Sequence, residues 1–181
     1  DVTSDDSMVA AVDQVLSETG RIDLLVNNAG YGSYGAIEDV PMDEARRQIE
    51  VNLFGLARMI QLVVPGMRAR RSGTIVNITS MGGKITTPFG GWYHASKFAV
   101  EGLSDALRLE LARFGVHVVV IEPGAIATEW GGIAMDTASA ASGQGPYAEQ
   151  VRAMDAGMNG AVARWASDPD VVARAIERAA T

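Results

Sequence analysis

The chain has 181 residues, with 15 Lys and Arg against 22 Asp and Glu, and a formal net charge of −7. This acidic balance argues against nucleic acid or an anionic membrane surface as the main partner. The absence of cysteine excludes disulfides and thiolate chemistry, and the two histidines, His94 and His117, share no metal-ligand spacing, so no metal site is expected.

Predicted elements alternate between helix and strand along the chain. The first helix has an apolar stripe of Met8, Val12, Val15 and Leu16 and ends at Gly20. Continuous apolar runs bounded by turn residues predict strands that are buried on both faces. In chain order the expected elements are helix 4–19, strand 22–26, helix 41–71 interrupted at Pro65-Gly66, strand 74–78, helix 93–114, strand 116–121 and helix 171–180.

This order implies an α/β fold, a Rossmann-like doubly wound parallel sheet with right-handed crossovers. No linker divides the chain, so we expect a single domain over residues 1–181. Residues 136–145, rich in Ala, Ser and Gly, are predicted to form a mobile loop. No apolar run approaches the ~18 residues of a membrane span, and the acidic N-terminus is unlike a signal peptide. We therefore expect a soluble, cytoplasmic protein without a membrane partner.

Tyr93 and Lys97 are four residues apart on a predicted helix and so lie on one face. An ammonium beside a phenol favours the phenolate, which predicts that Lys97 lowers the pKa of Tyr93 and makes it an acid/base near neutral pH. Alone, the spacing also occurs by chance, usually as a surface pair.

The segment Gly30-Tyr31-Gly32-Ser33-Tyr34-Gly35 matches the dinucleotide-binding pattern G-x-G-x-x-G and follows a strand. That fingerprint also needs a helix opening at the glycines and an acidic residue ~20 residues later at a second strand. Neither is expected here. We therefore interpret the segment as a loop beside the ligand crevice, not as a pyrophosphate cradle.

Further polar residues follow the predicted strands or interrupt apolar stretches. Ser80 follows strand 74–78, and residues 27–30 (Asn-Asn-Ala-Gly) end the preceding strand at the same sheet edge. Asn52 lies within an apolar helical stretch and must be hydrogen-bonded if it is buried. Each has a structural alternative: a cap or turn for Ser80, turn chemistry for residues 27–30, and a satisfied core amide for Asn52.

Together, these residues resemble the short-chain dehydrogenase/reductase family in order and spacing. The matching pieces are Asn27 to Gly30, Asn52 in Val51-Asn52-Leu53-Phe54-Gly55, Ser80, Tyr93 to Lys97, and Pro123-Gly124 with Thr128. The resemblance weakens over residues 129–167, a region that varies within the family and contributes the substrate loop.

The resemblance implies an oxidoreductase that uses NAD or NADP to interconvert an alcohol and a ketone or aldehyde. Tyr93 would be the general acid/base, Lys97 would hold the nicotinamide ribose, Ser80 would stabilise the substrate oxygen, and Asn52 would anchor a relay water. Further cofactor contacts are implied for Asp1, Val2, Asn28, Gly30, Pro123, Gly124, Ile126 and Thr128.

The family's pattern also extends beyond both ends of this chain. The Gly-rich cofactor loop and the residue that chooses NAD over NADP precede the position of Asp1, and a further strand follows the last helix, so the domain is expected to be incomplete at both ends. An apolar substrate is suggested by the side chains that flank the catalytic positions, although ordinary core packing explains each of them equally well: Met81, Phe89, Trp92, Trp130 and Met135. In the family that the chain resembles, the two long helices pair between copies, which implies a homodimer or homotetramer.

Two other functions remain open at this level. A non-catalytic nucleotide sensor or scaffold could keep the fold, although it need not retain the four catalytic residue types. A lyase, epimerase or dehydratase could use the same fold, although Asn52, Ser80, Tyr93 and Lys97 favour simple carbonyl and alcohol chemistry.

Overall fold

The computed structural model describes residues 1–181, except for the side chains of residues 159, 161 and 162. Its sheet has three parallel strands in the order β1 (Leu24–Asn27), β2 (Gly73–Ile78) and β3 (Val116–Ile121). Leu24 pairs with Thr74, and Thr74 pairs with His117. Helices separate the strands along the chain, which confirms the predicted α/β class.

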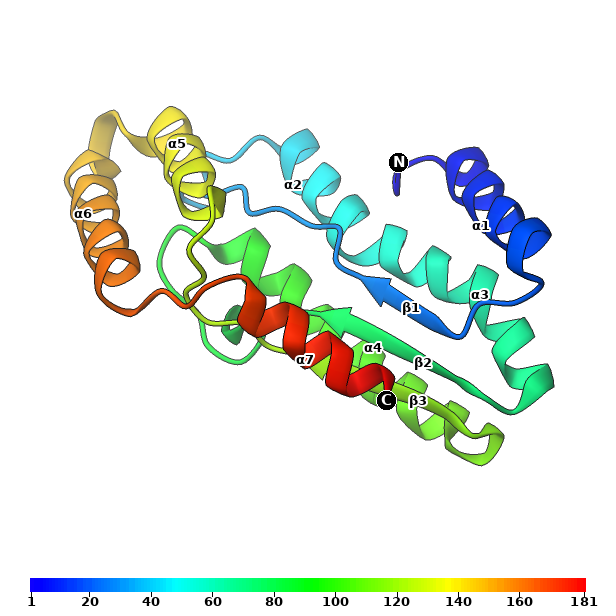
Figure 1. Cartoon of the computed structure of the whole chain (residues 1–181). Coiled ribbons are helices and arrows are strands. Elements are labelled where there is room, and N and C mark those ends of the chain that lie inside the picture. The colour runs from blue at the N-terminus through cyan, green and yellow to red at the C-terminus, as the bar shows by residue number, and fades with distance from the viewer.

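The helices cover both faces of this sheet (Figure 1). α7 (Asp170–Ala180) contacts β2 and β3 on one face, whereas α3 (Leu56–Arg70) and α4 (Gly91–Leu111) cover the other, and α1 (Asp5–Thr19) packs against α3. α5 (Trp130–Ser142) and α6 (Ala148–Trp165) stand beyond the carboxyl ends of the strands. The layers therefore leave the functional edge of the sheet between the strands and the α5–α6 pair.

The core lies between the sheet and α3 with α4. Ile75 at the centre of β2 is fully buried, and it packs in one cluster with Val63 and Met67 of α3 and Val100 of α4. Apolar contacts of this kind are the main stabilising term of the fold. β2 is consequently the most enclosed strand and a rigid base for the residues that follow it.

α1 matches its predicted bounds but only part of its predicted buried face. Ser4 caps the helix by accepting a hydrogen bond from the Ser7 amide at 3.3 Å, and Gly20 ends it in the left-handed region at φ 74°. Val15 and Leu16 are 42% and 39% exposed, so the prediction that they belong to the buried stripe is wrong. α1 packs mainly on α3, and a helix covers a narrower face than a sheet would.

The predicted helix 41–71 is helical throughout, and the expected interruption at Pro65-Gly66 is wrong. α3 continues through Pro65 because Val63 and Met67 on either side of it are buried in the core and hold the helix together. The irregularity lies earlier, between α2 (Met42–Ile49) and α3, where residues Glu50–Gly55 form a π-helix. Such π-turns are frequent at functional sites.

By length and composition alone, the run Met42–Arg70 could cross a membrane, with a mean hydropathy of 1.2 over its most apolar window. In the structure its apolar stripe faces the sheet, with Leu56, Ile60 and Val63 among the buried core residues. Packing within the domain accounts for part of this hydropathy, since 28% of the most apolar window is buried.

The predicted mobile loop at residues 136–145 is also wrong, because α5 extends to Ser142. Ala134 and Ala138 are fully buried on its inner face, and the Ser142 hydroxyl accepts a hydrogen bond from the Ala36 amide at 2.9 Å and donates one to Asp39 at 2.6 Å. These partners are about a hundred residues away in sequence. Local composition does not reveal an anchor of that kind.

Candidate active site

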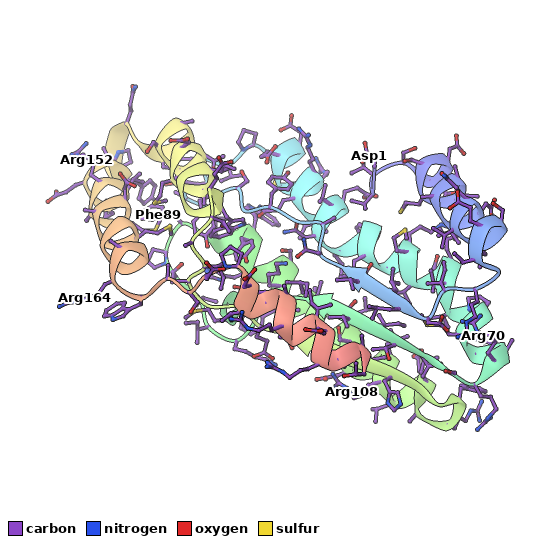
Figure 2. The ribbon with its side chains drawn as sticks, viewed as in Figure 1. Asp1, Arg70, Phe89, Arg108, Arg152 and Arg164 are labelled. Atoms are coloured by element: carbon purple, nitrogen blue, oxygen red, sulfur yellow. The ribbon has the colours of Figure 1, made fainter. Side chains whose placement is uncertain are left out.

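The carboxyl ends of the three strands meet at one edge, as expected for a ligand crevice in a parallel α/β sheet. The loops that follow β1, β2 and β3 gather there, and α4 begins directly beneath them. Figure 2 shows the side chains of this region, with Phe89 at the α5–α6 end of the molecule. Among the described residues, no three His, Cys, Asp or Glu side chains gather as a metal site.

Tyr93 lies in the first turn of α4 and is only 6% exposed. Its ring centroid is 5.0 Å from that of Trp130 and 5.8 Å from that of Tyr34. Burial raises the pKa of the Tyr93 phenol, and a hydrogen bond with Ser80 partly opposes this shift. The prediction that Lys97 lowers this pKa is therefore wrong for the chain by itself.

Lys97 does not lower the pKa of Tyr93 because of the position of its ammonium group. Nζ lies 5.8 Å from the centroid of the Tyr93 ring and donates a hydrogen bond to the carbonyl of Ile78 at 3.0 Å. Desolvation lowers the pKa of Lys97 to about 8, and the Glu101 carboxylate opposes the shift. Lys97 thus sits on the catalytic face beside Tyr93 but is directed at the end of β2.

Ser80 follows β2 and turns the chain toward α4. Its Oγ accepts a hydrogen bond from the Gly82 amide at 3.0 Å and so caps the short 3₁₀ turn Met81–Gly83. The same hydroxyl lies 3.5 Å from the Pro123 carbonyl, after β3. Ser80 is therefore both a cap, as its structural alternative proposed, and a direct neighbour of Tyr93.

Asn52 lies in the π-helix and is 1% exposed. Its Nδ2 donates to the Tyr31 carbonyl at 2.9 Å and to Ser96 Oγ at 3.0 Å, and its Oδ1 accepts from the Tyr31 amide at 3.0 Å. The amide thus ties the loop after β1 to α4. Both donors are used, and one acceptor position on Oδ1 remains for a water.

The loop after β1 is open enough for a ligand to approach its backbone. Asn28 and Gly30 are exposed, and a Cβ on Gly30 would stand 3.1 Å from Asn52 Oδ1 and 3.6 Å from Lys97 Nζ. A glycine here keeps free the space above the lysine, which fits a ribose held between loop and ammonium. No helix opens at these glycines, since α2 starts only at Met42.

The loop after β3 also contributes residues to the candidate site. The Pro123 carbonyl accepts from the Met81 amide at 2.9 Å, and Gly124 faces the Met81 sulfur. Ile126 pairs with Ser167 in an isolated parallel bridge, and the Thr128 hydroxyl accepts from the Trp130 amide at 3.3 Å. Their roles toward a cofactor stay predictions.

The two N-terminal residues lie apart from Tyr93. Asp1 accepts hydrogen bonds from the amide and hydroxyl of Thr3, each at 2.9 Å, and Val2 packs against Gly55 at the end of the π-helix. Their predicted contact with adenine is not tested by these contacts.

Two buried residues beside Tyr93 were not among the site residues predicted from the sequence. Tyr34, expected only as a loop residue, is 4% exposed and stacks in the aromatic cluster around Tyr93 and Trp130. His94 is 4% exposed, and its ring centroid is 5.7 Å from that of Tyr93. No local pattern marks Tyr34, whereas His94 was visible inside the Tyr93-to-Lys97 segment.

With this geometry described, comparison with known proteins is informative. Residues 1–137 match the short chain dehydrogenase family. The chain is 48% identical over 124 residues to a 3-ketodihydrosphingosine reductase of Bacteroides thetaiotaomicron, covering 68% of this chain and 46% of that protein. It is 42% identical over 147 residues to an NADPH-dependent 3-dehydrocapnine reductase of Ornithobacterium rhinotracheale, covering 78% and 49%.

Comparison with solved structures leads to the same family. The crystal structure of an NAD⁺-bound xylitol dehydrogenase superposes on the whole of this chain and 70% of its own, with a TM-score of 0.85 at 29% identity. The match to the family covers most of the sequence, and the strands, π-helix and Tyr93 turn lie within it. The protein belongs to the short-chain dehydrogenase/reductase family. It spans about half the length of the two curated relatives described above.

Proposed function

We propose that the protein is an oxidoreductase that uses NAD or NADP to interconvert an alcohol and a ketone or aldehyde. The observation that carries the proposal is the meeting of Ser80, Tyr93 and Lys97, from two elements, at the carboxyl edge of a parallel sheet. A buried phenol that is hydrogen-bonded to a serine hydroxyl is suited to exchanging a proton with a substrate oxygen.

Each residue has a separate task in this reaction. Tyr93 donates its proton to the oxygen of a ketone as it is reduced, or accepts the proton of an alcohol as it is oxidised. Ser80 donates a hydrogen bond to the same oxygen and stabilises its developing charge. Lys97 and the exposed backbone at Gly30 would hold the nicotinamide ribose, and Pro123, Gly124, Ile126 and Thr128 would cover the ring. The nicotinamide supplies or accepts the hydride when bound.

An apolar substrate fits the walls of the site. Tyr34, Tyr93 and Trp130 form an aromatic cluster, and Met135 is buried beside them. Phe89 packs edge-on against Tyr147 at 6.0 Å between centroids. Aromatic and apolar side chains beside a site favour apolar ligands, and the two bacterial relatives are named as reductases of a 3-keto and a 3-dehydro compound. We therefore propose an apolar ketone or its alcohol.

The proposal extends to the setting of the enzyme. A cytoplasmic homodimer or homotetramer agrees with the absence of cysteine and with the exposed apolar side chains on α4, Phe98 and Leu109. The choice between NAD and NADP stays open in this proposal, because neighbours of both kinds match the chain.

The test is Tyr93→Phe in the full natural gene product, assayed by nicotinamide absorbance with both nucleotides and a panel of apolar secondary alcohols and ketones. We expect kcat to fall by at least about 10³-fold, while nucleotide affinity changes little, because only the phenol oxygen is lost. Tyr147→Phe is the matched control: it loses a hydroxyl that bonds the Glu38 carboxylate but keeps the ring that packs against Phe89, so it should keep its activity. Turnover that survives Tyr93→Phe would overturn the mechanism.

A nucleotide-sensing protein on the same fold is the alternative. It predicts no turnover by the wild type on any member of the panel and equal nucleotide affinity in the wild type and Tyr93→Phe. The retained Ser80–Tyr93 contact favours the enzyme, because sensing has no need of it.

A further inference from the structure

The turn that carries Ser80 is attached to α4 by a buried imidazole. His94 is 4% exposed, and its Nδ1 lies 2.9 Å from the carbonyl oxygen of Gly82. Its Nε2 lies 3.0 Å from both the amide nitrogen and the hydroxyl of Thr87. One side chain therefore contacts both the 3₁₀ turn after Ser80 and the loop that leads back to α4.

These contacts determine which nitrogen of the ring carries the hydrogen. The Thr87 amide can only donate, so Nε2 must be an acceptor and is unprotonated. Nδ1 then carries the hydrogen and donates it to the Gly82 carbonyl. The contacts assign a neutral imidazole with its hydrogen on Nδ1.

Two glycines permit the imidazole to approach this closely. A Cβ on Gly82 would stand 3.0 Å from Nδ1, and a Cβ on Gly90 would stand 2.7 Å from Nε2. Both distances are shorter than ordinary contacts, so the ring fills a slot that larger residues would narrow. His94 is thereby fixed between the two ends of the 82–90 segment.

From His94 the contacts continue to the reacting groups. The Gly82 amide donates to Ser80 Oγ at 3.0 Å. Ser80 in turn is close enough to the Tyr93 phenol to lower its pKa. Tyr93 and His94 are consecutive residues of α4. This helix therefore carries both the phenol and the imidazole that holds the turn after Ser80. The orientation of Ser80 toward Tyr93 depends on this turn.

We propose that His94 is a positioning residue for the oxidoreductase reaction: its neutral imidazole holds the Met81–Gly83 turn and so keeps the Ser80 hydroxyl aimed at Tyr93. The inference rests on the proposed function for its kinetic consequence only. The clamp itself is a property of the structure and has a readout that needs no turnover.

The kinetic test compares His94→Leu with Ser80→Ala and with the double variant in the full natural gene product. We expect His94→Leu to lower kcat by about 10- to 100-fold with KM changed less than about threefold. The double variant should lose no more than Ser80→Ala alone, because both changes remove the same contact. The apparent pKa in the pH profile of kcat should rise in both single variants, since the Ser80 hydrogen bond lowers the pKa of Tyr93. Losses that multiply in the double variant would overturn the proposal.

A pair of polar variants separates the two contacts of the ring. His94→Asn keeps a donor near the Nδ1 position and the Gly82 contact, whereas His94→Gln keeps an acceptor near Nε2 and the Thr87 contact. We expect Asn to restore most of kcat and Gln to restore little. The reverse order would overturn the role assigned to Gly82, and this comparison remains decisive if His94→Leu does not fold.

Amide hydrogen exchange gives the readout without turnover. We expect faster exchange over residues 79–87 in His94→Gln than in the wild type, with His94→Asn close to the wild type. Unchanged exchange in this segment would overturn the clamp. If the wild type has no activity, the proposed function fails, while the exchange measurement still decides whether His94 holds the turn.

Discussion

At the scale of single residues, burial decides the electrostatics of this site. The Tyr93 phenol and Lys97 ammonium share a helix face, yet the pKa of each moves in the direction that desolvation imposes: upward for the phenol and downward for the ammonium. Both shifts favour neutral groups. The hydrogen bond from Ser80 is the one local interaction that favours ionised Tyr93, so the geometry of Ser80 matters more to the phenol than the distance to Lys97.

The low pKa of Lys97 predicts an alkaline gain in stability. Its folded pKa is about 8, against an ordinary 10.5, so the unfolded chain binds more protons between these values and the free energy of unfolding rises with pH. We expect a gain of about 1.5 kcal/mol from about pH 8 to about pH 9.5, measured by urea unfolding.

Lys97→Met should be more stable than the wild type at neutral pH and should lose this rise. The measurement stays below about pH 10, where the raised pKa values of Tyr34 and Tyr93 begin to act in the opposite direction. An equal rise in Lys97→Met and the wild type would show that Lys97 is not the source.

At the scale of elements, the π-helix and α5 connect the scaffold to the site. The π-helix turns Asn52 inward, where its amide bonds Tyr31 and Ser96 and so joins the loop after β1 to α4. α5 presents Trp130 over the same loop, 5.0 Å between ring centroids from Tyr93. Tyr93 is 6% exposed beside this ring, and we expect the indole to cover the phenol.

Gly32 lies against the Trp130 ring. A substitution at Gly32 therefore tests whether the position of the indole over Tyr93 depends on this glycine. A Cβ on Gly32 would stand 2.5 Å from Trp130 Cζ2, so Gly32→Ala should displace the indole and cost about 1 kcal/mol. In a background with Trp92 and Trp165 replaced by Phe, the emission of Trp130 should shift to longer wavelength and become more accessible to quencher.

Gly157→Ala is the control, because nothing stands within 4 Å of a Cβ at that position. If the emission of Trp130 is the same in Gly32→Ala and the control, the indole does not rest on Gly32.

At the scale of the whole molecule, the protein has two separately packed regions. The sheet with α3 and α4 holds one core cluster, and α5 with α6 holds a second that includes Tyr93 itself. The Tyr93 phenol therefore lies where the two packed regions meet.

The outer face of α4 predicts self-association. Phe98 and Leu109 are 44% and 81% exposed and lie about three helical turns apart on one side of the helix. Exposed apolar side chains in such a row are suited to an interface between two copies. We expect light scattering to give a dimer or tetramer for the natural gene product.

Leu109→Glu should lower the mass of that assembly, while Leu16→Glu on α1 should leave it unchanged. A monomeric wild type, or an assembly indifferent to Leu109→Glu, would contradict this interface.

Much of this molecule follows from patterns in the chain. Apolar periodicity predicted α1 and α4, and continuous apolar runs predicted the strands, close to their bounds, because both patterns are local properties of the sequence. The order of Asn52, Ser80, Tyr93 and Lys97 predicted a catalytic set through its resemblance to the family; the structure places Ser80 and Lys97 close to Tyr93, and the roles of these residues stay predictions. The predictions of a helix interruption at Pro65 and of a mobile loop at residues 136–145 were wrong, because core packing and the hydrogen bonds of Ser142 join residues that are far apart in the sequence.

The sequence by itself determined the α/β class, the family and the set of residues at the centre of the site. Only the tertiary structure decided the surroundings of those residues: the direction of the Tyr93 pKa, the aim of Lys97 at Ile78, the Trp130 cover and the clamp of His94 on the Ser80 turn. The physical reason is that burial and hydrogen bonding are properties of neighbours in space. Tyr93 and its nearest ring, Trp130, are 37 residues apart in the chain, since 130 − 93 = 37, and no local pattern links them.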